Sequence, residues 1–229
     1  MKDVIKSYEE FIRENKYSLN ESDDVLNSQT YDETYYDEKS KTVEIPENYK
    51  IIEKYVFAKK RIDELDLSQN TNLEEIRYGA FSQCGIKNLK LPSSIMIIGE
   101  HSFEFNKIQK IDLSNCTKLK KILADAFLAN LITDIKLPIN IKSLTFYVFA
   151  KNQIKLLDLS SYKYLYEMDF NVFLDNPLEE IKILKNLKIP YDKMYEKDPW
   201  NKFVKYYNEN DKKSGDYKYE NDEWAWYPL

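Results

Sequence analysis

The chain has 229 residues, 43% of them hydrophobic and 32% charged, so it can bury a core and is not a disordered polymer. Its 34 basic and 39 acidic residues give a net charge of -5, which argues against a nucleic-acid-binding protein with a dominant basic face. Two cysteines, one histidine and 4 glycines predict no metal site, no disulfide scaffold and no glycine-rich phosphate loop.

The first 39 residues are acidic, with 5 basic and 11 acidic side chains. Apolar residues at Val4, Ile5, Tyr8, Phe11 and Ile12 predict an amphipathic helix that caps an array, or alternatively docks on a partner. The following polar stretch up to residue 39 reads as a mobile linker or loop. Because acids interrupt the first residues, we expect no signal peptide and a cytoplasmic or intracellular protein, with the cell surface or secretion as the alternative.

Residues 40–189 form a repeat. Seven blocks begin at residues 40, 62, 86, 108, 132, 154 and 178, so the steps alternate between 22 and 24 residues. Each block opens with two apolar residues at a spacing of two, as in Leu65 and Leu67, which predicts a short strand. All blocks but the last carry a phenylalanine near the end, in a segment that suits a helical or 3-10 turn: Phe57, Phe81, Phe103, Phe127, Phe149 and Phe173.

Stacking such blocks predicts an α/β repeat solenoid. We expect one seven-stranded parallel sheet on one wall, short helical or 3-10 turns on the other, and a cap at each end. An asparagine column (Asn106, Asn130, Asn152 and Asn176) is expected to satisfy backbone groups between coils, with Cys84 in the same position of its block. Cys116 stands elsewhere in the repeat, which argues against a disulfide.

The blocks resemble BspA-type leucine-rich repeats. The resemblance rests on the pattern I-x-x-L-x-L-P followed by A/V-F-x-x-N/C, on LDLS or IDLS at 65–68, 111–114 and 157–160, and on DPWNKF at 198–203, which looks like the end of such an array. It implies a leucine-rich-repeat fold. It also implies adhesion or protein binding rather than catalysis, in a family that is often bacterial and surface-located or secreted.

Residues 190–229 hold all three tryptophans. A helix after Pro199 is expected to place Trp200, Phe203 and Tyr207 on one face. The last 14 residues alternate aromatic and polar side chains. This segment is interpreted as a C-terminal cap, with a tail that docks on a partner or on the array as the alternative.

Two further columns of the repeat carry titratable or charged side chains. His101 shares its position with Tyr55 and Tyr147, which favours a structural aromatic over a catalytic base, and no second histidine could activate a nucleophile. On the exposed strand face, charges alternate in sign from Asp66 onward. This alternation predicts a register ladder, a column of opposite charges that holds neighbouring coils in register, rather than a docking site. The ladder reads Glu44, Asp66, Lys90, Asp112, Lys136, Asp158 and Lys182.

The block that begins at Ile154 departs from its siblings. Tyr162, Tyr164 and Tyr166 stand where other blocks carry mostly polar residues, and Leu156 replaces Glu64 and Lys110. Tyrosines at a spacing of two share one face, and exposed tyrosine clusters are typical of binding surfaces. These four residues are the predicted partner-binding site, unless the aromatic C-terminal tail covers them.

We therefore expect a non-catalytic, protein-binding leucine-rich-repeat scaffold. The alternative is a surface or secreted adhesion domain. No catalytic residue, metal or cofactor is expected, and the partner is a protein rather than nucleic acid. No apolar run is long enough to insert in a membrane.

Overall fold

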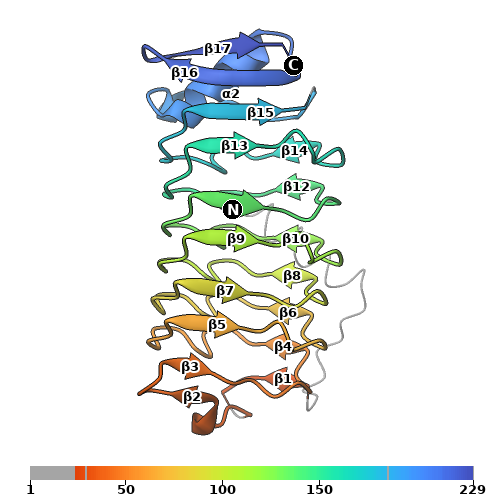
Figure 1. The fold of residues 1–229 in the computed structure, drawn as a ribbon, viewed down its shortest axis with the longest axis vertical. Helices are drawn as coiled ribbons and strands as arrows, with labels where there is room; N and C mark the ends of the chain where they lie inside the picture. The colour runs from red at the N-terminus through yellow and green to blue at the C-terminus, as the bar shows by residue number, and fades with distance from the viewer. Residues whose placement is uncertain (1–23, 29, 185, 229) are drawn as a thin grey trace.

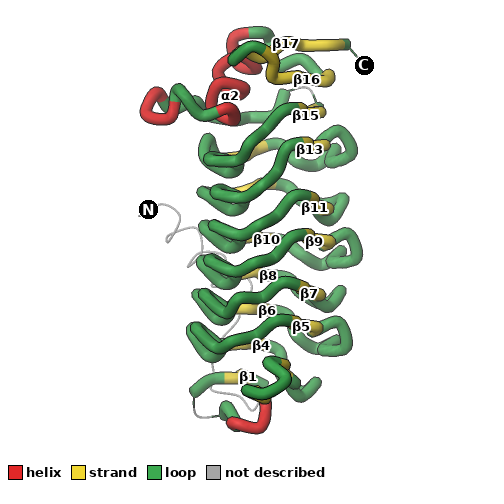
Figure 2. Tube along the Cα trace, turned by 60° about the vertical axis from the view of Figure 1, so that its left-hand side comes forward, coloured by secondary structure: helices red, strands yellow, loops and turns green. Residues whose placement is uncertain are grey.

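The computed structural model describes residues 24–28, 30–184 and 186–228, which form one stack of coils (Figure 1). The coils follow one another along the long axis, and a helix with a hairpin lies at the C-terminal end (Figure 2). A typical coil contributes a first strand, a turn, a two-residue second strand and then the segment that carries the phenylalanine. The predicted N-terminal helix lies outside the described residues.

The first wall holds the strands predicted at the start of each block. Its sheet is divided: β5 pairs with β7, β9 with β11, and β13 with β15, all parallel and 24 residues apart. The strands are β3 (Thr42–Val43), β5 (Glu64–Asp66), β7 (Asn88–Lys90), β9 (Lys110–Asp112), β11 (Asp134–Lys136), β13 (Leu156–Asp158) and β15 (Glu180–Ile183). The continuous seven-stranded sheet was therefore a wrong prediction.

Hydrogen bonding at one 22-residue step explains the interruption there. Within a strand pair the ladder continues past the strands, because the N–H of Leu113 donates to the carbonyl of Lys136 (2.8 Å). Between β11 and β13, the N–H of Leu137 donates instead to the hydroxyl of Tyr162 (3.0 Å). A side chain has thus taken the place of a ladder carbonyl.

The second wall is also made of strands, each two residues long. Five of them form one parallel sheet in the order β1-β4-β6-β8-β10, and β12 pairs with β14. They are β1 (Val25–Leu26), β4 (Ile51–Ile52), β6 (Glu75–Ile76), β8 (Ile97–Ile98), β10 (Lys121–Ile122), β12 (Ser143–Leu144) and β14 (Glu167–Met168). Figure 1 shows this column beside the first wall.

The phenylalanine segments are not helical, which corrects the predicted helical wall. Residues two before and two after most of the phenylalanines have positive φ, such as Asp125 at 60° and Ala129 at 54°. This turns alternate N–H groups toward the next coil: those of Asp125, Phe127 and Ala129 donate to carbonyls of residues 146, 148 and 150, at 3.0 Å each. Because these N–H groups serve the neighbouring coil, they cannot serve a helix. The array is mostly sheet, so the α/β label applies only loosely.

The core is a column of phenylalanine rings along the stack. Each ring from Phe57 to Phe173 lies parallel to the next, with centroids 5.0 to 5.7 Å apart. All six phenylalanines are fully buried, and the leucines and isoleucines of both walls surround them. Offset stacking and apolar burial therefore hold neighbouring coils together.

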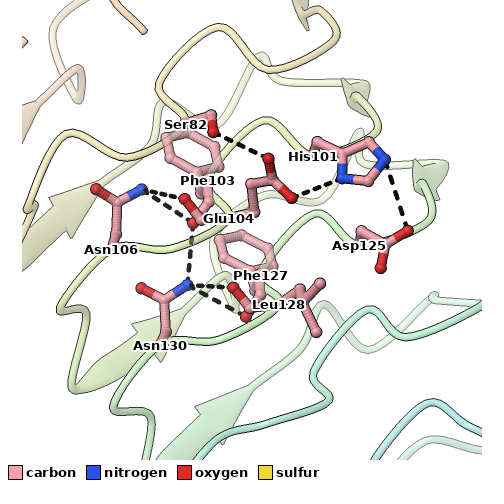
Figure 3. A network of polar contacts seen from close by, with 9 residues as sticks. All are labelled: Ser82, His101, Phe103, Glu104, Asn106, Asp125, Phe127, Leu128 and Asn130. Atoms are coloured by element: carbon pink, nitrogen blue, oxygen red, sulfur yellow. Dashed lines mark hydrogen bonds and ion pairs between the residues drawn. The ribbon is translucent and has the colours of Figure 1, made fainter. Parts of the chain in front are cut away.

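The asparagine column bonds as predicted. The Nδ2 of Asn130 donates to the carbonyls of Phe103 (2.9 Å) and Phe127 (3.2 Å), and its Oδ1 accepts from the N–H of Ile108 (3.1 Å). Asn106, drawn with it in Figure 3, makes the equivalent bonds in the preceding coil. Each buried amide thus satisfies backbone groups of two coils.

Residues 24–28 and 30–39, within the predicted linker or loop, form turns and short strands that belong to the stack. Strand β1 pairs with β4, and β2 (Tyr36–Asp37), which follows the 3-10 helix η1 (Glu33–Tyr35), pairs antiparallel with β3. The Tyr31 ring packs edge-on against Phe57 at 5.5 Å. Apolar side chains among the acids therefore build a first coil on the end of the phenylalanine column.

The C-terminal residues close the other end. After the 3-10 helix η2 (Lys193–Tyr195), helix α2 (Pro199–Glu209) begins at the N-cap Asp198, and the hairpin of β16 (Gly215–Glu220) and β17 (Glu223–Tyr227) follows. As expected, Trp200, Phe203 and Tyr207 are buried, and Trp200 packs edge-on against Phe173 at 5.1 Å. Strand β16 runs antiparallel to β15, which extends the first wall. Of the helices described, none is long and apolar enough to cross a bilayer.

Candidate functional site

Two of the predicted tyrosines stand out from the surface. Tyr164 is 62% exposed and Tyr166 is 58% exposed, in the turn between β13 and β14. The chain holds this turn by backbone bonds to its neighbours: the N–H of Tyr166 donates to the carbonyl of Lys142 (3.1 Å), and its carbonyl accepts from Lys188 (2.9 Å). The rings are therefore carried on a fixed backbone and remain open to solvent.

Tyr162 does not share their exposed face, which corrects the prediction. Its ring is half-buried against the core, and its hydroxyl accepts the N–H of Leu137 in the preceding coil. Asn70, at the same position two double repeats (four coils) earlier, also reaches back, donating from Nδ2 to the carbonyl of Ile45 (2.7 Å). Tyr162 thus has a structural role. At the same position in another block, Asn70 fills a comparable role with its side-chain amide.

Leu156 is 65% exposed on the outer face of β13, where its register partner in β15 is Glu180. The strand separates it from the tyrosines, which follow the strand's end. Leu156 therefore lies on the same coil as Tyr164 and Tyr166 without joining them in one cluster.

Ile139 was missed by the sequence reasoning. It is 55% exposed and lies in the turn after β11, next to the turn that carries the tyrosines, as the bond from Leu137 to Tyr162 shows. Glu47 and Ser93 hold the same position in the earlier blocks. A comparison between blocks at this position would have found it. We call Ile139, Tyr164 and Tyr166 the tyrosine patch.

The C-terminal tail does not cover the predicted site. The hairpin of β16 and β17 is engaged with β15 and helix α2, and Trp224 donates from its indole Nε1 to the carbonyl of Pro199 (2.8 Å). Leu156, Tyr164 and Tyr166 remain exposed beside it. The tail thus forms a lid on the end of the core rather than on the tyrosines.

The charges of the first wall are joined in pairs, not as one ladder. Lys90 lies 2.8 Å from Asp66, and Lys136 lies 3.6 Å from Asp112, in both cases across a 24-residue step. The lysine hydrogen bond lowers the pKa of Asp66 to about 2. Lys182 departs from the predicted ladder, since its ion pairs are with Glu180 and Asp216 of the cap strand β16.

His101 lies in a polar cluster in the phenylalanine segments that follow the second wall (Figure 3). Its Nδ1 is 2.7 Å from Glu104, its Nε2 is 3.7 Å from Asp125, and its ring packs on Tyr78 at 5.0 Å. Burial raises the pKa of Asp125, while the nearby His101 opposes that shift. Like Tyr55 and Tyr147, His101 has a positive φ. The three residues therefore share a left-handed backbone conformation as well as a position in the block.

Both cysteines are buried and free. Burial raises the pKa of Cys84 to about 12 and that of Cys116 to about 11, which keeps both thiols protonated and unreactive. Cys84 occupies the asparagine column, as predicted from its place in the block.

Comparison with known proteins agrees with these repeats. The BspA type leucine-rich repeat region matches in six copies, over residues 28–155 and 74–200, more than half of the chain. Among solved structures, a leucine-rich repeat protein from Bacteroides ovatus ATCC 8483 is similar, with 17% identity and a TM-score of 0.30, over 63% of this chain and 50% of that one. This chain thus spans half the length of that relative. No curated protein matches it. The six matched copies, together with the stacked coils, show that the chain belongs to the BspA-type leucine-rich-repeat family.

Proposed function

We propose that the protein is a non-catalytic scaffold that binds a protein partner through the tyrosine patch, with Leu156 at the margin of the contact. The observation that carries the proposal is the exposure of Ile139, Tyr164 and Tyr166 on adjacent turns of an array that elsewhere fills these positions with mostly polar residues. Tyrosine buries a large area at low entropic cost, so it is favoured at the centre of protein interfaces.

The rigidity of the array supports this function. Backbone bonds and buried asparagines connect each coil to the next, so a partner that contacts the patch does not have to order it first. The net charge of -5 supports a protein partner rather than a nucleic acid. Proteins of this family are typically binding or adhesion scaffolds, and neither role needs a catalytic site.

The test is an affinity purification from native lysate with matched variants. Tyr164→Ser combined with Tyr166→Ser removes both exposed rings and leaves Tyr162, which the fold uses, in place. The control is Tyr55→Ser combined with Phe105→Ser, which removes two rings of similar exposure (54% and 53%) elsewhere on the array. We expect the patch variant to lose a protein that the wild type and the control retain. If all three purify the same proteins, the patch is not the binding site.

Adhesion at a cell surface is the second candidate, because BspA-type repeats usually occur in surface or secreted proteins. The same patch would then contact a protein on another cell or in the matrix. Protease treatment of intact source cells separates the two locations. Loss of the protein from intact cells would support the surface role, and its survival until the cells are lysed would support the intracellular one.

A further inference from the structure

We propose that the protein self-associates through its last strand, with β17 of one copy pairing antiparallel with β17 of a second copy. In Figure 1, β17 is the outermost described element at the C-terminal end of the stack. The sheet order β13-β15-β16-β17 leaves one side of β17 without a strand neighbour among the described residues. An exposed sheet edge is a template for pairing with another strand.

The hairpin geometry identifies the backbone groups at this edge. A two-residue turn joins β16 to β17, with positive φ at Asn221 (52°) and Asp222 (68°), as a type I′ hairpin requires. In such a hairpin, hydrogen-bonded residue pairs alternate with non-bonded pairs, beginning with a bonded pair next to the turn. Trp224 and Trp226 are therefore in non-bonded pairs, so their N–H and C=O groups point away from β16 toward the edge.

Apart from the charge of Glu223 at its start, the strand lacks the features that protect natural edges. Glu223–Tyr227 contains no lysine and no proline, and its five register pairs with β16 run without a bulge. The indoles of Trp224 and Trp226 are already bound to the cap, donating to the carbonyls of Pro199 and Ser214. What the strand offers a neighbour is thus its backbone, not its tryptophan side chains.

Only one kind of two-fold register pairs these backbone groups fully. If Trp224 of one copy opposes Trp226 of the other, the two copies exchange four hydrogen bonds, and Ala225 faces its own copy on the two-fold axis. This central pair is of the non-hydrogen-bonded type, whose Cα atoms approach to about 4.5 Å. A small side chain at the closest point suits a second copy of this chain as the occupant.

On the outer face of the hairpin, which carries Asp216, Lys218, Glu220 and Glu223, the same register allows one attractive contact between the copies. The register places Tyr227 opposite Glu223 of the second copy. The Nζ of Lys218 already lies 5.3 Å from the centre of the Tyr227 ring, and Lys218 is on the same face. Pairing would therefore bring each Lys218 ammonium toward a Glu223 carboxylate of the other copy, twice per dimer.

A disulfide experiment tests the register. Ala225→Cys places two thiols at the axis, within the Cα separation that a disulfide spans. Tyr227→Cys is the matched control: it lies on the same face, but the register offsets it from its own copy by four residues, about 14 Å. Both native cysteines are buried and do not interfere. We expect the full chain to form a covalent dimer on mild oxidation with Ala225→Cys and not with Tyr227→Cys.

Light scattering on a sizing column supplies the second measurement. We expect a concentration-dependent dimer of the wild type and loss of that dimer in Ala225→Glu. The new carboxylate faces Lys218 within its own hairpin, but across the two-fold axis it faces the same carboxylate of the other copy. Mixing Ala225→Glu with Ala225→Lys should restore the dimer. A wild type that stays monomeric up to millimolar concentration, or equal crosslinking of both cysteine variants, overturns the proposal. Tyr164→Ser with Tyr166→Ser should leave the dimer intact, so this result is separate from the function of the tyrosine patch.

Discussion

The thiol of Cys84 lies 3.0 Å from the carbonyl oxygen of Phe57, the place where later coils put an asparagine amide. Asn106 makes the same contact one coil on, donating from Nδ2 to the carbonyl of Phe81 at 2.9 Å. A thiol is a weak donor and carries one hydrogen, whereas the amide has two donors and an acceptor. Cys84 is thus the weak step of the column.

Cys84→Asn should therefore stabilise the protein. The two side chains are similar in size, and a well-formed hydrogen bond in place of a weak one contributes about 1 kcal/mol. Chemical denaturation of the wild type and the variant measures the difference in unfolding free energy. Cys84→Ala is the control and should destabilise, since it removes the contact. An asparagine variant no more stable than the alanine variant would show that the coil has no room for the amide.

The sequence alone predicted the coil because the positions that fill the core repeat with the same chemistry. Each phenylalanine and each asparagine stands at a fixed place in its block, and burial of these side chains leaves little choice of arrangement. The left-handed positions beside the phenylalanines could not be predicted in the same way. Tyr55, His101 and Asp125 share one of them without a common chemistry, because bonds to the next coil, not local propensity, set this backbone.

The candidate site, like the coil, could be predicted in part from the comparison of blocks. Exposure of Tyr164 and Tyr166 follows from comparing blocks, since the same positions elsewhere are polar. The inward orientation of the Tyr162 side chain does not follow from that comparison. Its partner is the N–H of Leu137, which becomes available only when two coils meet in register. Contacts between coils, rather than within one, account for what the sequence did not show.

Phe127→Ala tests the ring column. Phe127 lies between Phe103 at 5.4 Å and Phe149 at 5.6 Å and is fully buried. Removing the ring leaves a cavity in a middle coil and should cost about 3–5 kcal/mol of unfolding free energy. Chemical denaturation checks this, with Phe127→Leu as a smaller change at the same site. A loss below about 1 kcal/mol would be outside the range for a core phenylalanine.

Lys90→Asp combined with Lys136→Asp tests the paired charges of the first wall. Each substitution replaces an attraction with a repulsion, against Asp66 and Asp112 respectively. The variant should be less stable than the wild type at low salt, and the difference should shrink at high salt because exposed pairs are screened. Thermal unfolding at both salt concentrations measures this.

The pairing itself has a sharper control. Swapping one pair, as Asp66→Lys with Lys90→Asp, reverses both charges but keeps their attraction across the 24-residue step. The swapped variant should keep most of the wild-type stability. If it is as unstable as the doubly acidic variant, or if salt leaves the loss unchanged, the lysines do not act through these carboxylates.

Asp169 gives the fold a dependence on pH. Burial, with a smaller contribution from Glu167, raises the pKa of its carboxyl from 3.8 to about 6, while Lys188 opposes the shift. A carboxyl whose pKa is raised by folding favours the folded state when it is protonated. Its stabilising contribution is therefore complete below about pH 3.8 and is lost as the pH rises through about 6.

Asp169→Asn removes this titration, because the amide stays neutral at every pH. The variant should gain on the wild type as the pH rises from 4 to 7, and the gain should level off above the pKa of about 6. Unfolding free energies from chemical denaturation at a series of pH values measure the gain. Asp66→Asn is the control: Asp66 is exposed and its pKa is lowered to about 2 by the bond from Lys90, so this variant should show no such gain over the same range. Parallel curves for the wild type and Asp169→Asn between pH 4 and 7 would show that the carboxyl at 169 titrates alike in the folded and unfolded chains.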